Sequence, residues 1–126
     1  MKNKIFFLVI FLLIISTGII LADSWAVGDR CLANWSYDSY WYPGTIIETD
    51  GSLYHIQFDD GDREWLSAGS LTEENLGVGT YVEVNWMWGG FYYNGTIAER
   101  IGDVIYIHYD DGDREWTTIS AVRVMY

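Results

Sequence analysis

The chain has 126 residues, a net charge of −11 and an aromatic content of 17%. Nucleic acids are bound through lysine and arginine side chains that neutralise phosphates, so a chain this acidic is a poor nucleic-acid binder. Cys31 is the only cysteine, which excludes an intramolecular disulfide. Its place in an alternating strand pattern predicts a buried, unreactive thiol.

The first residues have the pattern of an export signal. Lys2 and Lys4 precede a long apolar stretch, and Ala22 supplies a small residue at a cleavage position. This order predicts a signal peptide over residues 1–22 and an exported protein, whether periplasmic, secreted or in the secretory pathway. The alternative is an uncleaved membrane anchor, because residues 5–22 are at the short end of a membrane span. Without this segment five arginines face 18 acidic side chains, and the net charge of −13 favours cationic partners.

The remainder of the chain contains one module twice, at an offset of 51 residues. The heptapeptide Asp-Asp-Gly-Asp-Arg-Glu-Trp occupies residues 59–65 and again 110–116. From Val27 to Glu73, 18 of 47 positions match the residue 51 places later. A repeat at fixed spacing indicates a repeated structural unit. We therefore predict two domains, residues 25–73 and 78–126, which lie side by side because the connection between them is too short for a free linker.

Each module has the pattern of short antiparallel strands. Apolar and polar residues alternate over residues 79–86, and the first copy alternates likewise around Cys31, which predicts a first strand with one buried face. The heptapeptide predicts a hairpin turn, because glycine accepts a positive φ and aspartate can cap its own turn. The second predicted strand is residues 42–49 in the first copy and 93–100 in the second, and the third is 53–58 and 104–109. The fourth strand begins at the end of each heptapeptide. The fifth is residues 121–126 in the second copy, with a weaker counterpart near Leu71 in the first.

No segment predicts a helix, and five short strands in about 50 residues predict a small, strongly bent barrel. The predicted fold class is therefore all-β, with two tandem five-stranded barrels after the N-terminal apolar segment.

At the level of motifs, the chain resembles the Tudor domain and the related Agenet modules of the Royal superfamily. The resemblance covers nearly all of residues 25–126, twice and in the same order, and it implies SH3-like barrels. The segments that carry it are Val27–Trp35, Trp41–Ile46 and Gln57–Gly61 in the first copy, and Tyr92–Ile97 and His108–Gly112 in the second.

The resemblance also implies a function, because many Tudor domains hold methylated lysine or arginine in a cage of aromatic side chains. Aromatic faces attract such a cation by ~0.5–2 kcal/mol per contact. The implied partners are a basic or methylated peptide or protein, or a small quaternary ammonium ligand, without a cofactor. Carried over by position, the cage of the first copy consists of Trp35, Tyr42 and Phe58, closed by Trp65 across the hairpin and rimmed by Asp60. The cage of the second copy consists of Trp86, Tyr93 and Tyr109, closed by Trp116 and rimmed by Asp111.

Two structural alternatives remain open for the same residues. Trp35 and Trp86, at the ends of alternating strands, are also suited to fill a barrel core. The acidic residues 59–64 crowd one turn and suggest calcium, but calcium takes six to eight oxygen ligands and the ordered ligand loop is missing. A solvated turn is the favoured interpretation, and no metal site is predicted.

An enzyme is not predicted. His55 and His108 do not occupy equivalent positions of the repeat, and the chain has no nucleophile motif, glycine-rich phosphate loop or cysteine–histidine metal pattern.

The alternative function is that of an exported structural or adaptor protein whose barrels hold a partner chain or a cell-wall polymer. The loop between the first two strands is aromatic in both copies and otherwise diverged, which suggests two non-identical surfaces. Its aromatic residues are Tyr37, Tyr40 and Trp41 in the first copy and Trp88, Phe91 and Tyr92 in the second.

Overall fold

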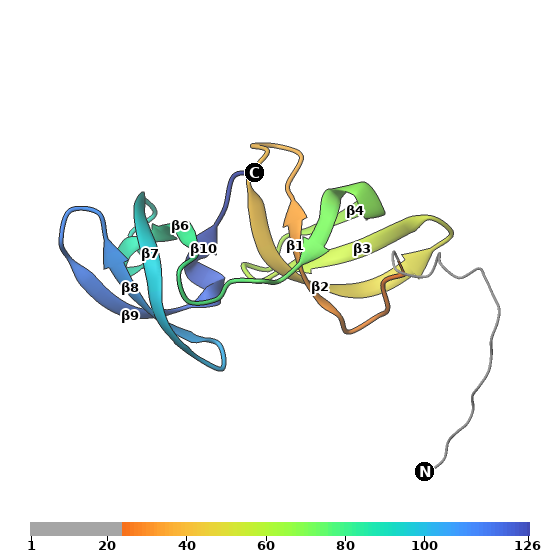
Figure 1. Ribbon diagram of the computed structural model, residues 1–126. Helices are drawn as coiled ribbons and strands as arrows, with labels where there is room; N and C mark the ends of the chain where they lie inside the picture. Colours follow the sequence, from red (N-terminus) through yellow and green to blue (C-terminus); the bar gives the residue numbers. More distant parts are fainter. Residues whose placement is uncertain (1–23) are drawn as a thin grey trace, which may run out of the picture.

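The computed structural model describes residues 24–126 (Figure 1). The predicted signal peptide or anchor, residues 1–22, lies outside the described residues. Within the described part of the chain, no helix is long and apolar enough to cross a membrane.

Two antiparallel sheets of five strands each curl into small barrels that stand side by side (Figure 1). The all-β fold class with two five-stranded barrels is thereby confirmed. Barrel 1 has the strand order β4-β3-β2-β1-β5 and barrel 2 the order β10-β6-β7-β8-β9. The strands of barrel 1 are β1 (Arg30–Asn34), β2 (Trp41–Asp50), β3 (Leu53–Phe58), β4 (Arg63–Ser67) and β5 (Leu71–Glu73). Those of barrel 2 are β6 (Tyr81–Asn85), β7 (Tyr92–Ile101), β8 (Val104–Tyr109), β9 (Arg114–Thr118) and β10 (Val122–Arg123).

The ends of some strands differ from the sequence prediction because single turns of 3-10 helix replace them. Trp86 begins η4 (Trp86–Trp88), so β6 ends one residue earlier than expected. The last strand was expected over 121–126, but η5 (Ile119–Ala121) leaves only a two-residue β10. In barrel 1 the corresponding turn is η3 (Ala68–Ser70). A three-residue turn is too short to produce a helical hydrophobic period, so the sequence pattern does not signal it.

The long second strand of each barrel bends at a β-bulge. The register of β2 against β3 shifts between Ile46 and Glu48, and that of β7 against β8 shifts between Ile97 and Glu99. A bulge adds an unpaired residue and increases the local twist. One strand can therefore serve both sides of a small barrel, because it pairs with the first strand at its start and with the third strand from Gly44 or Gly95 onward.

Each barrel has an apolar core, and the core of barrel 2 extends into the contact between the barrels. The core of barrel 1 consists of Cys31, Ala33, Ile46, Ile56, Phe58, Leu66 and Leu71. Leu32 of barrel 1 and Leu76 of the connecting segment instead belong to the core cluster of barrel 2, and both are fully buried. Strand β1 therefore has apolar residues on both faces, one toward its own core and one toward the other barrel.

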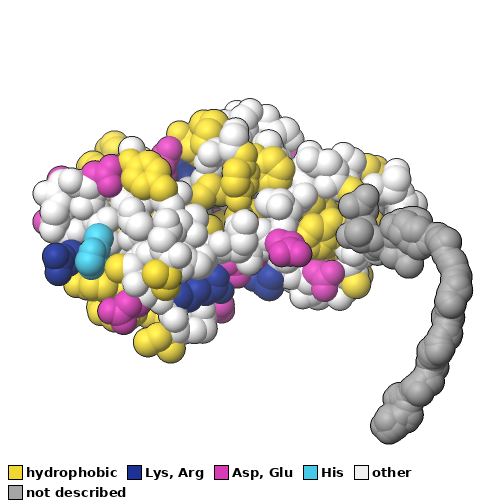
Figure 2. Space-filling view, in the orientation of Figure 1, with side chains coloured by type: hydrophobic (Ala, Val, Ile, Leu, Met, Phe, Trp, Pro, Cys, Tyr) yellow, Lys and Arg dark blue, Asp and Glu magenta, His cyan; other side chains and the backbone are white. Residues whose placement is uncertain are grey.

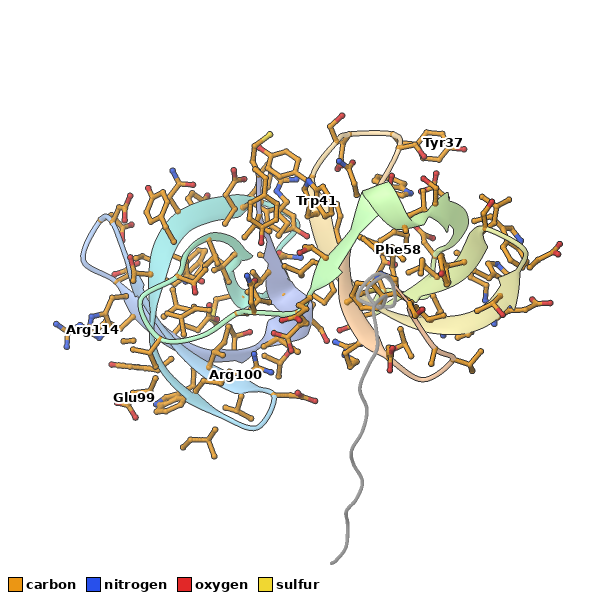
Figure 3. The ribbon with its side chains drawn as sticks, turned by 45° about the vertical axis from the view of Figure 1, so that its right-hand side comes forward. Tyr37, Trp41, Phe58, Glu99, Arg100 and Arg114 are labelled. Carbon is orange, nitrogen blue, oxygen red and sulfur yellow. The ribbon has the colours of Figure 1, made fainter. Side chains whose placement is uncertain are left out.

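The C-terminus returns to barrel 1 and joins the two barrels by backbone hydrogen bonds. The N–H of Trp41 donates to the carbonyl of Val124 at 2.8 Å, and the N–H of Val124 donates to the carbonyl of Trp41 at 3.0 Å. The Trp41 ring also meets the Tyr126 ring edge to face, with centroids 5.4 Å apart. Figure 3 shows Trp41 between the barrels. The barrels are thus docked on each other, as the short connection predicted.

Candidate functional site

The repeated heptapeptide forms the turn between the third and fourth strands of each barrel. Asp60 Oδ1 accepts a hydrogen bond from the N–H of Asp62 at 2.9 Å, and Asp111 Oδ1 accepts the same bond from Asp113 at 2.9 Å. Gly61 has a φ of 99°, a left-handed conformation that glycine adopts without steric cost. The turn is therefore stabilised by its own side chains and presents two carboxylates per barrel.

The glutamate of the heptapeptide ties this hairpin to the loop that follows the first strand. Glu64 Oε1 accepts a hydrogen bond from the N–H of Ser36 at 3.3 Å, and Glu115 Oε1 accepts one from Met87 at 3.1 Å. Glu115 Oε2 also accepts the hydroxyl of Tyr109 at 2.6 Å. These bonds fix the loop after the first strand against the hairpin, so residues from both can line one pocket.

The first aromatic pocket is a cavity of about 110 Å³ on barrel 1. The rings of Trp35 and Tyr42 meet edge to face with centroids 6.1 Å apart, and those of Tyr42 and Phe58 do so at 6.3 Å. Rings set nearly at right angles can form adjoining walls of one pocket. The complete lining is Trp35, Tyr42, Phe58, Asp60, Asp62 and Tyr92.

The second aromatic pocket is the counterpart on barrel 2, with a volume of about 150 Å³. It is lined by Trp86, Tyr93, Tyr109, Asp111 and Asp113. Trp86 and Tyr93 meet edge to face with centroids 6.1 Å apart and an interplanar angle of 89°, close to the geometry of the first pocket.

The two pockets differ in how far their walls are exposed. Trp86 and Tyr93 are 43% and 48% exposed, so neither ring fills the core of barrel 2. Tyr109, 6% exposed, is part of that core and forms the floor. In the first pocket Trp35 is only partly exposed, because it packs against the core of barrel 1 and its ring contacts that of Tyr37, with centroids 5.1 Å apart. The second pocket is therefore the more open of the two.

Two tyrosines of the pockets, Tyr42 and Tyr109, are neutral at physiological pH because their pKa values are raised. Burial, followed by the hydrogen bond to Asp38, raises the pKa of Tyr42 to about 12. Burial and the hydrogen bond to Glu115 raise the pKa of Tyr109 well above its ordinary value. Tyr42 and Tyr109 thus present uncharged aromatic faces, and the aspartates of the turn bring negative charge to each pocket. Such a combination attracts a cation and repels an anion.

Trp65 and Trp116 do not line either pocket, although their position in the repeat predicts them as the fourth wall. Trp65 pairs with His55 across β3 and β4, and the two rings stack with centroids 4.4 Å apart. Trp116 packs on Tyr106 at 4.8 Å in the same position of barrel 2. Successive residues of a strand point to opposite faces, so Leu66 enters the core and Trp65 faces outward.

Three lining residues of the pockets are not among those predicted from the sequence. Asp62 and Asp113 accompany Asp60 and Asp111 in the pockets, and their presence in the repeated turn was the available signal. Tyr92 belongs to barrel 2 but lines the pocket of barrel 1. No local pattern signals this role, because it depends on how the barrels dock.

Other reactive groups are sparse in the described residues. From residue 24 to 126, no three side chains of Asp, Glu, His or Cys are grouped so that they could hold a metal ion. Cys31 is fully buried, and burial raises the pKa of its thiol to about 11, so the reactive thiolate is suppressed.

Comparisons with known proteins bear on the fold. No protein-family model matches the chain, and a search of curated proteins found no match. The crystal structure of the Crb2 tandem Tudor domains is similar, with a TM-score of 0.58 and 20% identity over 77% of each chain. The AGD34 structure of Arabidopsis thaliana AGDP1 also matches, with a TM-score of 0.43 and 10% identity over 83% of this chain and 85% of that one. Together with the two five-stranded sheets, the first of these matches shows that the chain has the fold of tandem Tudor domains, two SH3-like barrels in one chain.

Proposed function

We propose that this protein is a non-catalytic binding module whose aromatic pockets hold a cationic group, namely methylated lysine or arginine or a small quaternary ammonium. The observation that carries the proposal is the duplication of the pocket. Each barrel supplies a tryptophan after its first strand, a tyrosine near the start of its second, an aromatic floor at the end of its third and two aspartates on its turn. The neighbouring loop residues differ between the copies, whereas these positions keep the same chemistry.

The chemistry of the pockets suits a methylated ammonium better than an unmodified one. Methylation keeps the positive charge but removes N–H donors, so the cation is weakly hydrated and loses little on entering an aromatic site. Each aromatic face contributes ~0.5–2 kcal/mol, and tryptophan contributes most. The two aspartates of each turn add attraction at the rim, as opposite charges favour each other most strongly where water is partly excluded.

The size of the pockets supports the same ligand class. A cavity of roughly 150 Å³ holds a molecule as large as benzene. A trimethylammonium head has four non-hydrogen atoms against six in benzene, so cavities of about 110 and 150 Å³ are large enough for it. A nucleotide or another full cofactor is far larger than either cavity.

We further propose that the partner is a basic peptide or protein met outside the cytosol. Two features support this: the export-signal pattern of residues 1–22 and the net charge of −13 in the remainder of the chain. Charge of this size speeds encounter with a basic partner, and the effect falls with ionic strength. Localisation of the native protein and its measured mass test the first feature; a chain that keeps residues 1–22 and stays in the cytosol would contradict it.

The decisive variants exchange a pocket tryptophan for alanine. The probe is a short basic peptide with one trimethyl-lysine, and binding is followed at each indole N–H by NMR. Trp35→Ala should abolish binding at the first pocket and Trp86→Ala at the second, because each removes the strongest wall. Trp65→Ala is the matched control, since it removes an equally large ring that lines no pocket.

The far-UV circular dichroism spectrum decides whether these rings are pocket walls or core. Retained spectra with lost binding support the proposal. If the Trp35→Ala and Trp86→Ala double variant unfolds, or if it binds as well as the wild type does, the pockets are not the site.

The adaptor function is the second candidate, and the exposure of the loop aromatics favours it. Tyr37 is 82%, Trp88 58% and Phe91 74% exposed, and Figure 3 shows Tyr37 pointing away from the barrel. Partner binding that survives the pocket variants but fails in Phe91→Ala or Trp88→Ala would establish this function instead.

A further inference from the structure

Arg123 lies between two tyrosine rings that belong to different barrels. Its guanidinium carbon is 3.8 Å from the ring centroid of Tyr40 in barrel 1 and 3.9 Å from that of Tyr92 in barrel 2. A planar guanidinium stacks well on aromatic faces, and two faces hold it from both sides. Arg123 itself comes from β10, the strand beside the C-terminal bridge to β2.

The edge of the guanidinium is also held. The Nε and Nη2 groups of Arg123 donate to Glu83 Oε1 at 3.1 and 2.9 Å, and Nη1 donates to the Tyr42 hydroxyl at 3.4 Å. The two tyrosine rings on its faces and the hydrogen bonds along its edges therefore fix one orientation of the Arg123 side chain. An ammonium on a lysine stem has no such plane, so it could not make the same set of contacts.

These contacts reach two walls of the first aromatic pocket. Tyr92 is touched on its ring and Tyr42 at its hydroxyl, and both side chains line the pocket. We propose that Arg123 is a positioning residue for the first pocket: it holds Tyr92 of barrel 2 in place as a wall of a site that barrel 1 cannot complete alone. This inference rests on the proposed cation-binding function.

The second aromatic pocket has no arginine held in this way, because the corresponding residues of the repeat differ. At the offset of 51 residues, Arg123 corresponds to Thr72, Tyr40 to Phe91, Tyr92 to Trp41 and Glu83 to Leu32. These four residues, which we call the clasp, all differ in the other copy, whereas Tyr42, which also contacts Arg123, is retained as Tyr93. The second pocket is lined by residues of barrel 2 alone. The two pockets are therefore non-equivalent: the first depends on barrel docking and the second does not.

Arg123 is not required to hold the barrels together. Leu32 and Leu76 are fully buried in the core of barrel 2, and the Trp41–Val124 backbone bonds join the sheets independently of the side chain of Arg123. Loss of the arginine should leave a folded, docked protein in which Tyr92 is no longer held. Binding and stability are thus separable in the test.

The test compares Arg123→Ala with Arg123→Lys and with Arg114→Ala. Arg114 is exposed at the outer end of barrel 2, as Figure 3 shows, so its replacement reproduces the loss of one positive charge without touching the clasp. The probe is the trimethyl-lysine peptide, and the indole N–H signals of Trp35 and Trp86 report the two pockets separately.

Arg123→Ala should weaken binding at Trp35 by roughly threefold or more, which is the affinity that one aromatic face contributes, and leave binding at Trp86 unchanged. Arg123→Lys should recover part of the loss. Arg114→Ala should leave binding at Trp35 unchanged and affect binding at Trp86 only slightly, because Arg114 follows Asp113 of the second pocket. Unchanged affinity at Trp35 in Arg123→Ala, or an equal fall at both pockets, overturns the inference.

A ligand-free measurement separates this inference from the proposed function. The ring-proton signals of Tyr42 and Tyr92 should shift in Arg123→Ala and stay in place in Arg114→Ala. If the wild type binds the peptide at neither pocket, the proposed function fails. If the tyrosine signals do not move in Arg123→Ala, the positioning role fails whether or not the peptide binds.

Discussion

Gly95→Ala should destabilise barrel 2, because β7 and β8 approach each other too closely at this residue for any side chain. A Cβ atom at Gly95 would lie 2.8 Å from Ile107 Cγ2, 3.0 Å from the carbonyl oxygen of His108 and 3.3 Å from the Cα of Tyr109. The carbonyl cannot rotate away alone, since β8 is also paired with β9. The strands must separate, and overpacking of this kind costs ~1–3 kcal/mol. Because Tyr109 is the floor of the second pocket, the same change should shift the Trp86 indole signal.

Urea unfolding followed by circular dichroism measures the loss in the free energy of unfolding. Gly44→Ala should behave in the same way in barrel 1, where the Cβ would meet Ile56 Cγ2 at 2.9 Å and the carbonyl oxygen of Gln57 at 3.1 Å. Gly69→Ala is the control, since no heavy atom lies within 4 Å of its Cβ position, and it should change stability by less than ~0.5 kcal/mol. If Gly95→Ala is as stable as Gly69→Ala, the close approach described for β7 and β8 is wrong.

Three further predictions concern the docking, the pH dependence and the second pocket. Leu32→Ala should lower the free energy of unfolding in urea by ~2–5 kcal/mol, because the side chain is fully buried in the core of the other barrel. Leu53→Ala, at a 42% exposed position, should lower it far less. Equal losses would contradict the docked arrangement. Burial, then a hydrogen bond to a carboxylate, raises the pKa of Tyr42 from 10.0 to about 12, so its stabilising contribution is complete below pH 10 and lost as the pH rises through about 12. Tyr42→Phe should therefore lose less stability than the wild type in urea titrations between pH 10 and 12, and parallel curves would refute this. Glu115→Ala should speed hydrogen exchange at the amide of Met87 and weaken peptide binding at the second pocket alone. If the Met87 amide is protected from exchange as strongly as in the wild type, the hydrogen bond does not hold the loop.

The all-β fold was predictable because its signals are local and occur twice. Alternation in the first strand, a turn with glycine at positive φ and an offset of 51 residues specify the same hairpins in both halves. The ends of the strands were less predictable. Trp86 continues the alternating pattern of β6, yet it begins a 3-10 turn, because the chain must turn there toward β7.

The pocket was predictable as far as it is made by one barrel. Trp35, Tyr42 and Phe58 come together because three neighbouring strands end at the same rim. Trp65 was misplaced because the strand register sets it opposite His55 and on the outer face. A one-residue difference in register reverses the face of every side chain, so Trp65 could reach the pocket only if Leu66 did not enter the core.

Features that need both barrels were beyond the sequence pattern. Tyr92 and Leu32 act across the interface, where the repeat gives no information because the two copies differ. Figure 2 shows hydrophobic side chains at the surface over the middle of the molecule, and further ones toward both ends. Positions at which the copies of a repeat have diverged are therefore where docking contacts should be sought.

The central claim is that positive charge, held by aromatic faces, drives binding. The most direct test is to compare the trimethyl-lysine peptide with the same peptide carrying a tert-butyl group, which has the same shape and no charge. At each of two to three faces the cation gains ~0.5–2 kcal/mol, so the charged peptide should bind at Trp35 and Trp86 roughly tenfold or more tightly. Equal affinity for the two peptides, or binding of neither, would contradict the account.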